Sequence, residues 1–266
     1  MDMRTKNSFN GSLLVALVAA IVGIGLVAGS ALAQSRRHFL PAVVAGPPAA
    51  ASCDLPNTRY STLHINGPAL SVNPERDENL NLGHRGYETT DAPRKLVVLG
   101  PVHDSKAPQF PSLFADRRTP ALTGTYQRFR WDENCDCPLD TYSRWETTVL
   151  GMGVKPGETI YTPDSGYDIG GGNEFMVMYA AENRITLHVG REDEFYGYVV
   201  YIEDVCVDPD LLALYRRSQA AGRYELPVLR GHQPFGKAIG QELRIAVRDN
   251  GSWMDPRSRN DWWIGR

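Results

Sequence analysis

The stretch EFMVMYA at residues 174–180 is followed closely by ITLHV at 185–189 and YVVYI at 198–202. Each is short and rich in β-branched and aromatic residues, which favour strands. The chain also holds 25 glycines and 18 prolines, too many for a helical bundle of 266 residues. These features predict a mostly β fold built from closely spaced strands, and they argue against a long parallel α/β enzyme.

Two further patterns lie downstream of these strands. Asp208-Pro209-Asp210 precedes an apolar-polar segment that ends near Gly222, which predicts a capped helix, the one substantial helix of the chain. Leu243, Ile245 and Val247 alternate with polar or small residues before Asn250-Gly251, a pair typical of a tight hairpin turn. We expect a strand with one face open to solvent.

Composition excludes several classes of protein. The chain has 28 Lys and Arg against 31 Asp and Glu, a net charge of −3, and 42% of its residues are hydrophobic. It is therefore neither a disordered tail nor a basic nucleic-acid binder, and we expect no nucleic-acid partner.

The N-terminus has the features of an export signal. Arg4 and Lys6 precede an apolar run over 13–32, and small residues at 30–33 provide a cleavage site after Ala33. The apolar run is also long enough to span a bilayer, so residues 1–33 are either a signal peptide or an uncleaved anchor. An Ala- and Pro-rich linker follows at 34–55. We expect a secreted or envelope-associated, extracytoplasmic protein that meets the membrane only through an uncleaved N-terminal segment.

Four cysteines, Cys53, Cys135, Cys137 and Cys206, would then lie in an oxidising compartment, where disulfides persist. Three pairings are possible. One residue separates Cys135 from Cys137, so we favour a distant partner for one or both of them, and Cys206 is the obvious candidate. No second pair of closely spaced ligands accompanies them, which disfavours zinc.

Four stretches of the C-terminal half carry a family resemblance, which spans residues 157–256. They are DSGYDI at 164–169, VMYAAENRI at 177–185, FYGYVVYI at 195–202, and VLRGHQPFG at 228–236 continued by ELRIAVRDNGSWMDP at 242–256. In this order they resemble the lysostaphin-type zinc peptidoglycan endopeptidases. The resemblance implies an antiparallel β-sandwich or barrel-like hybrid domain over 147–256 with one inserted helix. An irregular β-rich region at 56–146 would precede it, and a tail at 257–266 would follow.

The departures from the family pattern are as informative as the matches. The positions that hold zinc and assist the chemistry in that family read Asp164, Asp168, Glu242 and Arg244 here. A guanidinium cannot lose its proton to become a zinc ligand. The resemblance therefore implies a degenerate member without the zinc set, and we expect no metal, no cofactor and no catalytic residue.

Alternation on the last strand suggests what replaces the metal. Residues at i and i+2 share a strand face, so Glu242, Arg244 and Arg248 would point the same way. If Asp164 and Asp168 lie opposite, the Arg244 guanidinium could bridge them as a structural ion cluster. Two alternatives stay open: an ordinary solvated strand face, and a calcium site built on the two aspartates.

Aromatic residues allow a second kind of interaction. Tyrosines at 196, 198, 201 and 224 could stack on sugars, but packing in the core is favoured because they lie in strands. Trp253 could also stack on a sugar. Trp262 and Trp263 stand in the tail, where they would either fold back on the domain, which we favour, or dock onto a partner.

These expectations combine into one functional hypothesis. The chain would be an exported, non-catalytic, peptidase-like scaffold or binding module of the cell envelope, with peptidoglycan or an envelope protein as its partner. The alternatives are a metal-dependent cell-wall hydrolase with an atypical carboxylate site, and a secreted structural or adhesive surface protein.

Overall fold

A computed structural model describes residues 52–66, 73–101, 104–141, 143–192 and 196–264. The predicted signal or anchor at 1–33 lies outside these residues, as does the predicted linker except for 52–55. None of the described helices combines the length and apolar character that crossing a bilayer requires.

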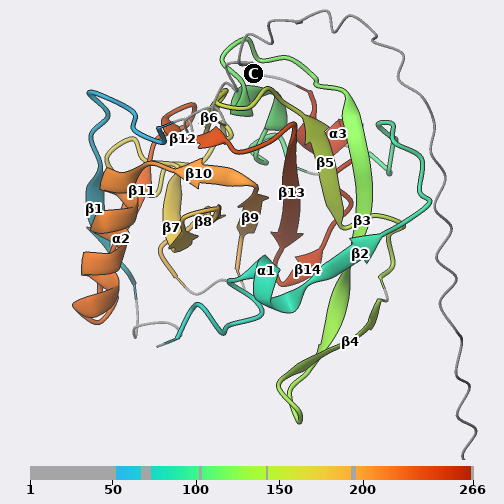
Figure 1. The fold of residues 1–266 in the computed structure, drawn as a ribbon, viewed down its shortest axis with the longest axis horizontal. Coiled ribbons are helices and arrows are strands. Elements are labelled where there is room, and N and C mark those ends of the chain that lie inside the picture. The colour runs from blue at the N-terminus through green and yellow to red at the C-terminus, as the bar shows by residue number, and fades with distance from the viewer. Residues whose placement is uncertain (1–51, 67–72, 102–103, 142, 193–195, 265–266) are drawn as a thin grey trace, which may run out of the picture. The chain divides into compact units, whose positions relative to one another are not determined.

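An open sheet of eleven strands forms most of the fold (Figure 1). The spatial order is β1-β11-β7-β8-β9-β13-β5-β3-β2, with β14 added to β13 and β4 added to β3, and every pairing is antiparallel. The strands are β1 (Ser61–His64), β2 (Tyr87–Thr89), β3 (Leu122–Asp132), β4 (Cys137–Thr141), β5 (Val149–Gly153), β7 (Phe175–Ala181), β8 (Arg184–His188), β9 (Tyr198–Glu203), β11 (Glu225–Leu229), β13 (Glu242–Asp249) and β14 (Ser252–Trp253). The prediction of a mostly β, antiparallel fold is confirmed, and the sheet does not close into a barrel.

A small second sheet and a few helices complete the described structure. The sheet has the order β10-β12-β6. Its strands are β6 (Thr159–Tyr161), β10 (Val205–Val207) and β12 (Pro234–Ala238), and the helices are α1 (Leu82–Arg85), the 3-10 turn η1 (Phe110–Leu113), α2 (Pro209–Ala220) and α3 (Arg259–Trp262). The predicted helix is α2: Asp208 caps it by accepting a hydrogen bond from the Asp210 N–H at 2.8 Å, and Pro209 occupies its first turn.

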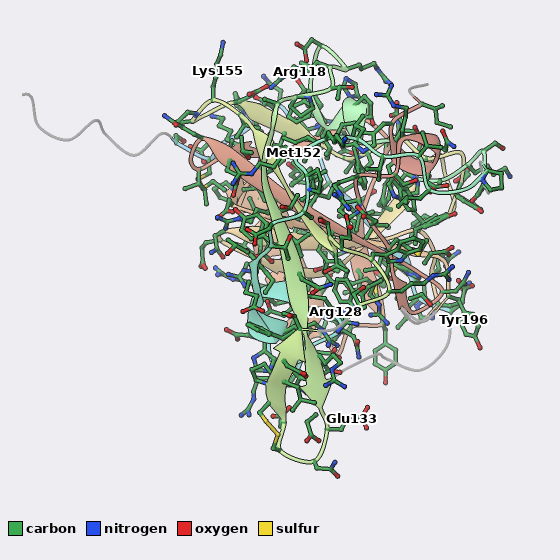
Figure 2. All side chains as sticks on the ribbon, turned by 90° about the vertical axis from the view of Figure 1, so that its right-hand side faces the viewer. Arg118, Arg128, Glu133, Met152, Lys155 and Tyr196 are labelled. Atoms are coloured by element: carbon green, nitrogen blue, oxygen red, sulfur yellow. A yellow bond between two sulfur atoms is a disulfide. The ribbon has the colours of Figure 1, made fainter. Side chains whose placement is uncertain are left out.

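The region at 56–146 is not separate from the sheet. It supplies β1, β2 and β3, and β3 pairs directly with β5 through Thr125 opposite Leu150. No boundary therefore falls at residue 146, and the described residues belong to one compact unit. The β3–β4 hairpin extends away from the rest of the fold, with Glu133 near its tip (Figure 2).

The sheet carries apolar side chains on both faces. On β13, Leu243, Ile245 and Val247 pack into the main core with residues of η1, α2 and α3. The opposite face, which we call the outer face, holds a smaller cluster. Its members are Leu82, Val149, Val199, Tyr201, Ala246 and Trp253, with Tyr87 and Tyr126 packed against them. Tyr198 and Tyr201 are buried as predicted, whereas Tyr196 and Tyr224 are exposed.

The C-terminal tail folds back onto the main core, as predicted. Trp262 stacks on Phe110 with ring centroids 5.8 Å apart, and Trp263 meets the same ring edge-on at 5.6 Å. Both indole N–H groups donate to backbone carbonyls, those of Asp255 and Pro256, at 2.9 Å. Because both rings are buried with their polar atoms satisfied, the tail is part of the fold.

The hairpin turn at the end of β13 is also confirmed. Asn250 and Gly251 connect β13 to β14, and both have positive φ, 45° and 76°. A two-residue turn of this kind needs φ > 0 at both positions, which Asn and Gly tolerate best. The turn returns the chain so that Trp253 lies opposite Arg248.

The cysteines pair differently from the preferred arrangement. Cys53 is bonded to Cys206 on β10, and Cys135 is bonded to Cys137 at the tip of the β3–β4 hairpin. The prediction that Cys135 or Cys137 would bond to a distant cysteine was wrong, because Cys206 is bonded to Cys53. The Cα atoms of Cys135 and Cys137 lie 5.2 Å apart, within the usual range for a disulfide.

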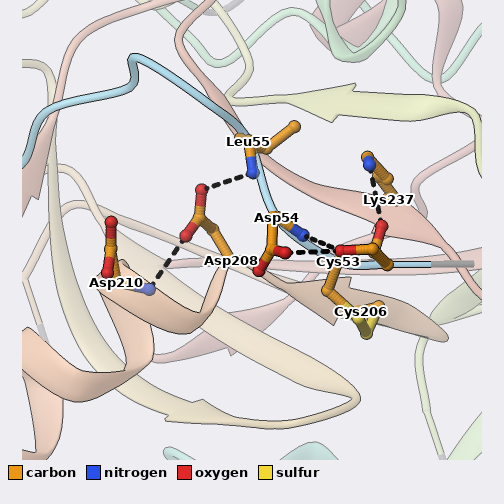
Figure 3. The surroundings of a disulfide bond; sticks show 8 residues. Cys53, Asp54, Leu55, Cys206, Asp208, Asp210 and Lys237 are labelled. Carbon is orange, nitrogen blue, oxygen red and sulfur yellow. Dashed lines mark hydrogen bonds between the residues drawn. A yellow bond between two sulfur atoms is a disulfide. The ribbon is translucent and has the colours of Figure 1, made fainter.

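The Cys53–Cys206 bridge fastens the N-terminal segment to the fold (Figure 3). Beside it, the Leu55 N–H donates to Asp208 at 3.2 Å, and Lys237 Nζ donates to the Ser52 carbonyl at 2.7 Å. Residues 52–55, predicted as the end of a linker, are therefore attached to β10, β12 and the start of α2.

Candidate functional site

The candidate site lies on the outer face of β13. Glu242, Arg244, Ala246 and Arg248 share this face, as the alternation predicted. The expectation that the face is open to solvent was wrong for its second half, because Arg248 is only 3% exposed and Ala246 is fully buried. Side chains from α1, β2 and β14 cover them.

The first half of the face is a charged cluster around Arg244. Its Nε donates to Glu242 at 2.8 Å, and its Nη1 donates to Asp204 at 2.8 Å. Glu242 also accepts hydrogen bonds from Thr123 and Tyr126, both at 2.6 Å. Burial opposes ionisation of Glu242, but these hydrogen bonds and Arg244 outweigh it, so its pKa is lowered.

A glycine on β5 leaves room for the Glu242 side chain to reach Thr123 and Tyr126 on β3. Gly151 on β5 lies between β13 and β3, and a Cβ on it would be 2.5 Å from a Glu242 carboxylate oxygen. Only glycine leaves room for the Glu242 side chain to cross β5.

The predicted bridge from Arg244 to Asp164 and Asp168 is not formed. Asp164 follows β6 on the main-core side of the sheet, where it pairs with Arg117 and its N–H bonds Ser112 at 2.6 Å. Asp168 accepts from two backbone N–H groups, those of Gly170 at 2.7 Å and Gly172 at 3.1 Å. The register of β13 sends Arg244 to the opposite face, so the two aspartates cannot meet it.

A buried carboxylate adjoins the charged cluster. Glu203 on β9 lies opposite Arg244 in the sheet and has Arg184 at 3.5 Å. Burial raises its pKa to about 7, an effect that Arg184 only partly offsets. The Glu203 carboxyl therefore titrates near neutral pH.

The second half of the outer face is an arginine cluster, formed by Arg85, Arg128 and Arg248 around Trp253. Their guanidinium carbons lie 5.5, 5.3 and 5.6 Å from the centroid of that ring. Tyr201 stacks on the same indole at 5.0 Å. Three guanidinium groups therefore surround one aromatic ring in cation–π contacts, which concentrates positive charge around Trp253.

The arginine cluster has few negative partners. Among the described residues its one ion pair joins Arg85 to Glu78 at 3.8 Å. Otherwise backbone carbonyls, the Asn79 amide and the Tyr201 hydroxyl accept from Arg85 and Arg248. Arg128 Nε is buried and has no hydrogen-bond partner in the described part of the chain, and burial together with the two neighbouring arginines lowers the pKa of Arg128 to about 10. A surplus of positive charge therefore remains here.

A pocket of about 570 Å³ opens beside the arginine cluster. We call it the Trp253 pocket. It is lined by Arg128, Ser143, Arg144, Trp145, Asp249, Asn250, Gly251, Ser252, Trp253 and Met254. Arg144 is exposed and lies over the Trp145 ring at 4.9 Å, so two tryptophans, two arginines and one aspartate, Asp249, line one hollow.

Sequence reasoning identified Arg248 and Trp253 but missed Arg85, Arg128, Arg144 and Trp145. In part the signal was present: Tyr126 and Arg128 stand at i and i+2 within TYQRFRW at 125–131, which places them on one strand face. What that face meets depends on the pairing of β3 with β5 and on the β13–β14 turn.

No three His, Cys, Asp or Glu side chains of the described residues are grouped so that they could hold a metal ion. Comparison with protein families, curated proteins and solved structures finds no match to this chain. The resemblance to the lysostaphin-type endopeptidases therefore stays a prediction.

Proposed function

We propose that this chain is an exported, non-catalytic binding module of the cell envelope and that its ligand is peptidoglycan. The observation that carries the proposal is the Trp253 pocket, in which Trp145 and Trp253 stand beside an arginine cluster short of negative partners. The export signal predicted at residues 1–33 would bring the pocket to the compartment where peptidoglycan is exposed.

The chemistry of the pocket fits a glycan that bears carboxylates. Indole rings bind the C–H faces of sugars, and guanidinium groups bind carboxylates through paired hydrogen bonds. Arg128 lines the pocket and forms no ion pair with the described residues, so a ligand carboxylate would pair with its guanidinium. Because the whole chain is acidic, with a net charge of −3, this positive hollow is local rather than a general attraction for polyanions.

Co-sedimentation of the full chain, purified in mild detergent, with isolated peptidoglycan sacculi tests the proposal. Arg128→Gln and Trp145→Ala should each weaken binding by about tenfold, the cost of losing one well-placed contact of about 1.4 kcal/mol. Arg230→Gln is the matched control, since it removes an exposed arginine that lines a different pocket.

Folding and binding should separate in Arg128→Gln. The substitution relieves repulsion with Arg85 and Arg248, so the variant should be at least as stable as the parent chain while it binds less. A parent chain that does not sediment with sacculi, or an Arg128→Gln variant that binds like the Arg230→Gln control, would overturn the proposal.

A further inference from the structure

A second, smaller hollow adjoins the Trp253 pocket. This hollow, the Asp261 pocket, has a volume of about 240 Å³. It shares Arg144, Trp145 and Met254 with the Trp253 pocket, and its other lining residues are Leu99, Asp255, Ser258 and Asp261. The two pockets are therefore adjacent, and we call them together the groove.

The charge of the groove changes along its length. Arg128 and Asp249 line only the Trp253 pocket, Arg144 lines both pockets, and Asp255 and Asp261 line only the Asp261 pocket. The Asp255 carboxylate is already neutralised by Arg257 at 2.7 Å, with both side chains 2% exposed. Asp261 is thus the carboxylate that gives this end its negative character.

Asp261 is buried, and it has no cationic partner among the residues that the structure describes. It is 8% exposed, and its carboxylate accepts a hydrogen bond from the Ser258 hydroxyl at 2.5 Å. None of the ion pairs among the described residues includes it. Its place in the first turn of α3 offers some stabilisation, but a helix of four residues supplies little. A buried carboxylate in this state favours a cation as its partner.

We propose that the groove binds a dipolar ligand, with a carboxylate at Arg128 and Arg144 and a primary ammonium at Asp261. Trp145, Met254 and Leu99 would contact the apolar chain between the two charges. This inference rests on the proposed function, and it assigns the groove to the peptide part of peptidoglycan, in which carboxylates and a free side-chain amine occur together.

The single carboxylate without an ion pair in the Asp261 pocket favours an ammonium over a guanidinium. An ammonium is a compact charge on a flexible methylene stem, whereas a guanidinium is a broad plane that needs several acceptors. The pocket has apolar walls from Leu99, Trp145 and Met254 for the stem, and one unneutralised carboxylate at which the stem can end.

Chemically modified sacculi test this inference. The full chain is titrated against untreated sacculi, sacculi whose free amines have been acetylated, and sacculi whose carboxylates have been amidated. Acetylation and amidation should each weaken binding about tenfold. Asp261→Asn should bind untreated and acetylated sacculi equally, because it has lost the group that senses the amine.

The variant keeps an acceptor for the Ser258 hydroxyl, so it should fold, and circular dichroism checks this. Glu133→Gln, at the exposed tip of the β3–β4 hairpin, is the control for the loss of one negative charge, and it should still distinguish acetylated sacculi. Arg144→Gln, an exposed position, provides a second variant that should lose the response to amidation.

The outcomes are distinguishable. Equal binding of the parent chain to untreated and acetylated sacculi would overturn the dipolar ligand and leave the proposed function standing. An Asp261→Asn variant that folds and still distinguishes acetylated sacculi would overturn the role of Asp261. A parent chain that does not bind untreated sacculi would overturn the proposed function and the inference together.

Discussion

The two disulfides should differ greatly in their contribution to stability. Cys53 and Cys206 are separated by 153 positions, whereas Cys135 and Cys137 are separated by 2. A crosslink stabilises mainly by restricting the unfolded chain, and the effect grows with the logarithm of the loop length. The loop-entropy relation gives about 5 kcal/mol for the long loop and about 1.5 kcal/mol for the short one.

Two double variants measure this difference. Cys53→Ser with Cys206→Ser removes the long loop, and Cys135→Ser with Cys137→Ser serves as the matched control. Urea unfolding followed by tryptophan fluorescence should show a midpoint about 2 M lower for the first variant, given an m value of about 2.5 kcal/mol/M for a domain of this size. The control should shift by about 0.5 M.

The predicted difference between the two disulfides depends on loop length alone. Equal midpoint shifts in the two double variants would refute it, as would a loss below about 1 kcal/mol on removal of the long loop. The second result would mean that the N-terminal segment stays ordered in the unfolded chain or is only weakly held in the native one.

Three further substitutions have defined outcomes. Glu203→Gln should be nearly neutral at pH 4 and stabilising by up to about 3 kcal/mol at pH 8, because the folded pKa of about 7 lies above the ordinary 4.5 and stability is lost as the pH rises between them. Thermal melts that change identically with pH in both proteins would contradict this. Arg257→Met should cost about 3–5 kcal/mol by leaving Asp255 buried and unpaired, and adding Asp255→Asn should recover much of the loss in the same urea assay. Trp262→Ala should cost about 3–5 kcal/mol if the tail belongs to the core, whereas a loss near zero would show that it does not.

Local sequence patterns were sufficient to predict much of the fold. The strands β7, β8 and β9, the capped helix α2 and the Asn250-Gly251 turn could all be predicted because their signals lie within a few residues. The pairing of β3 with β5 could not, since β5 is short and holds two glycines, and a segment with Pro and Asp at 133–148 separates it from β3.

The candidate site was predicted only in part, for the same reason. Alternation showed that Glu242, Arg244 and Arg248 share a face, but it could not show which side of the sheet Asp164 would occupy. Arg248 was expected in solvent because arginine is rarely buried, and its burial depends on Trp253 returning over it through the turn.

The bridge between Cys53 and Cys206 also decides how the fold bears mechanical load. A pull applied along the chain from its N-terminal side reaches Cys53 before it reaches β1, so the tension passes through a covalent bond into β10. The hydrogen bonds between β1 and β11 lie beyond that point and are shielded from the tension. If the chain is tethered upstream, the edge of the sheet will not be peeled away while the disulfide is intact.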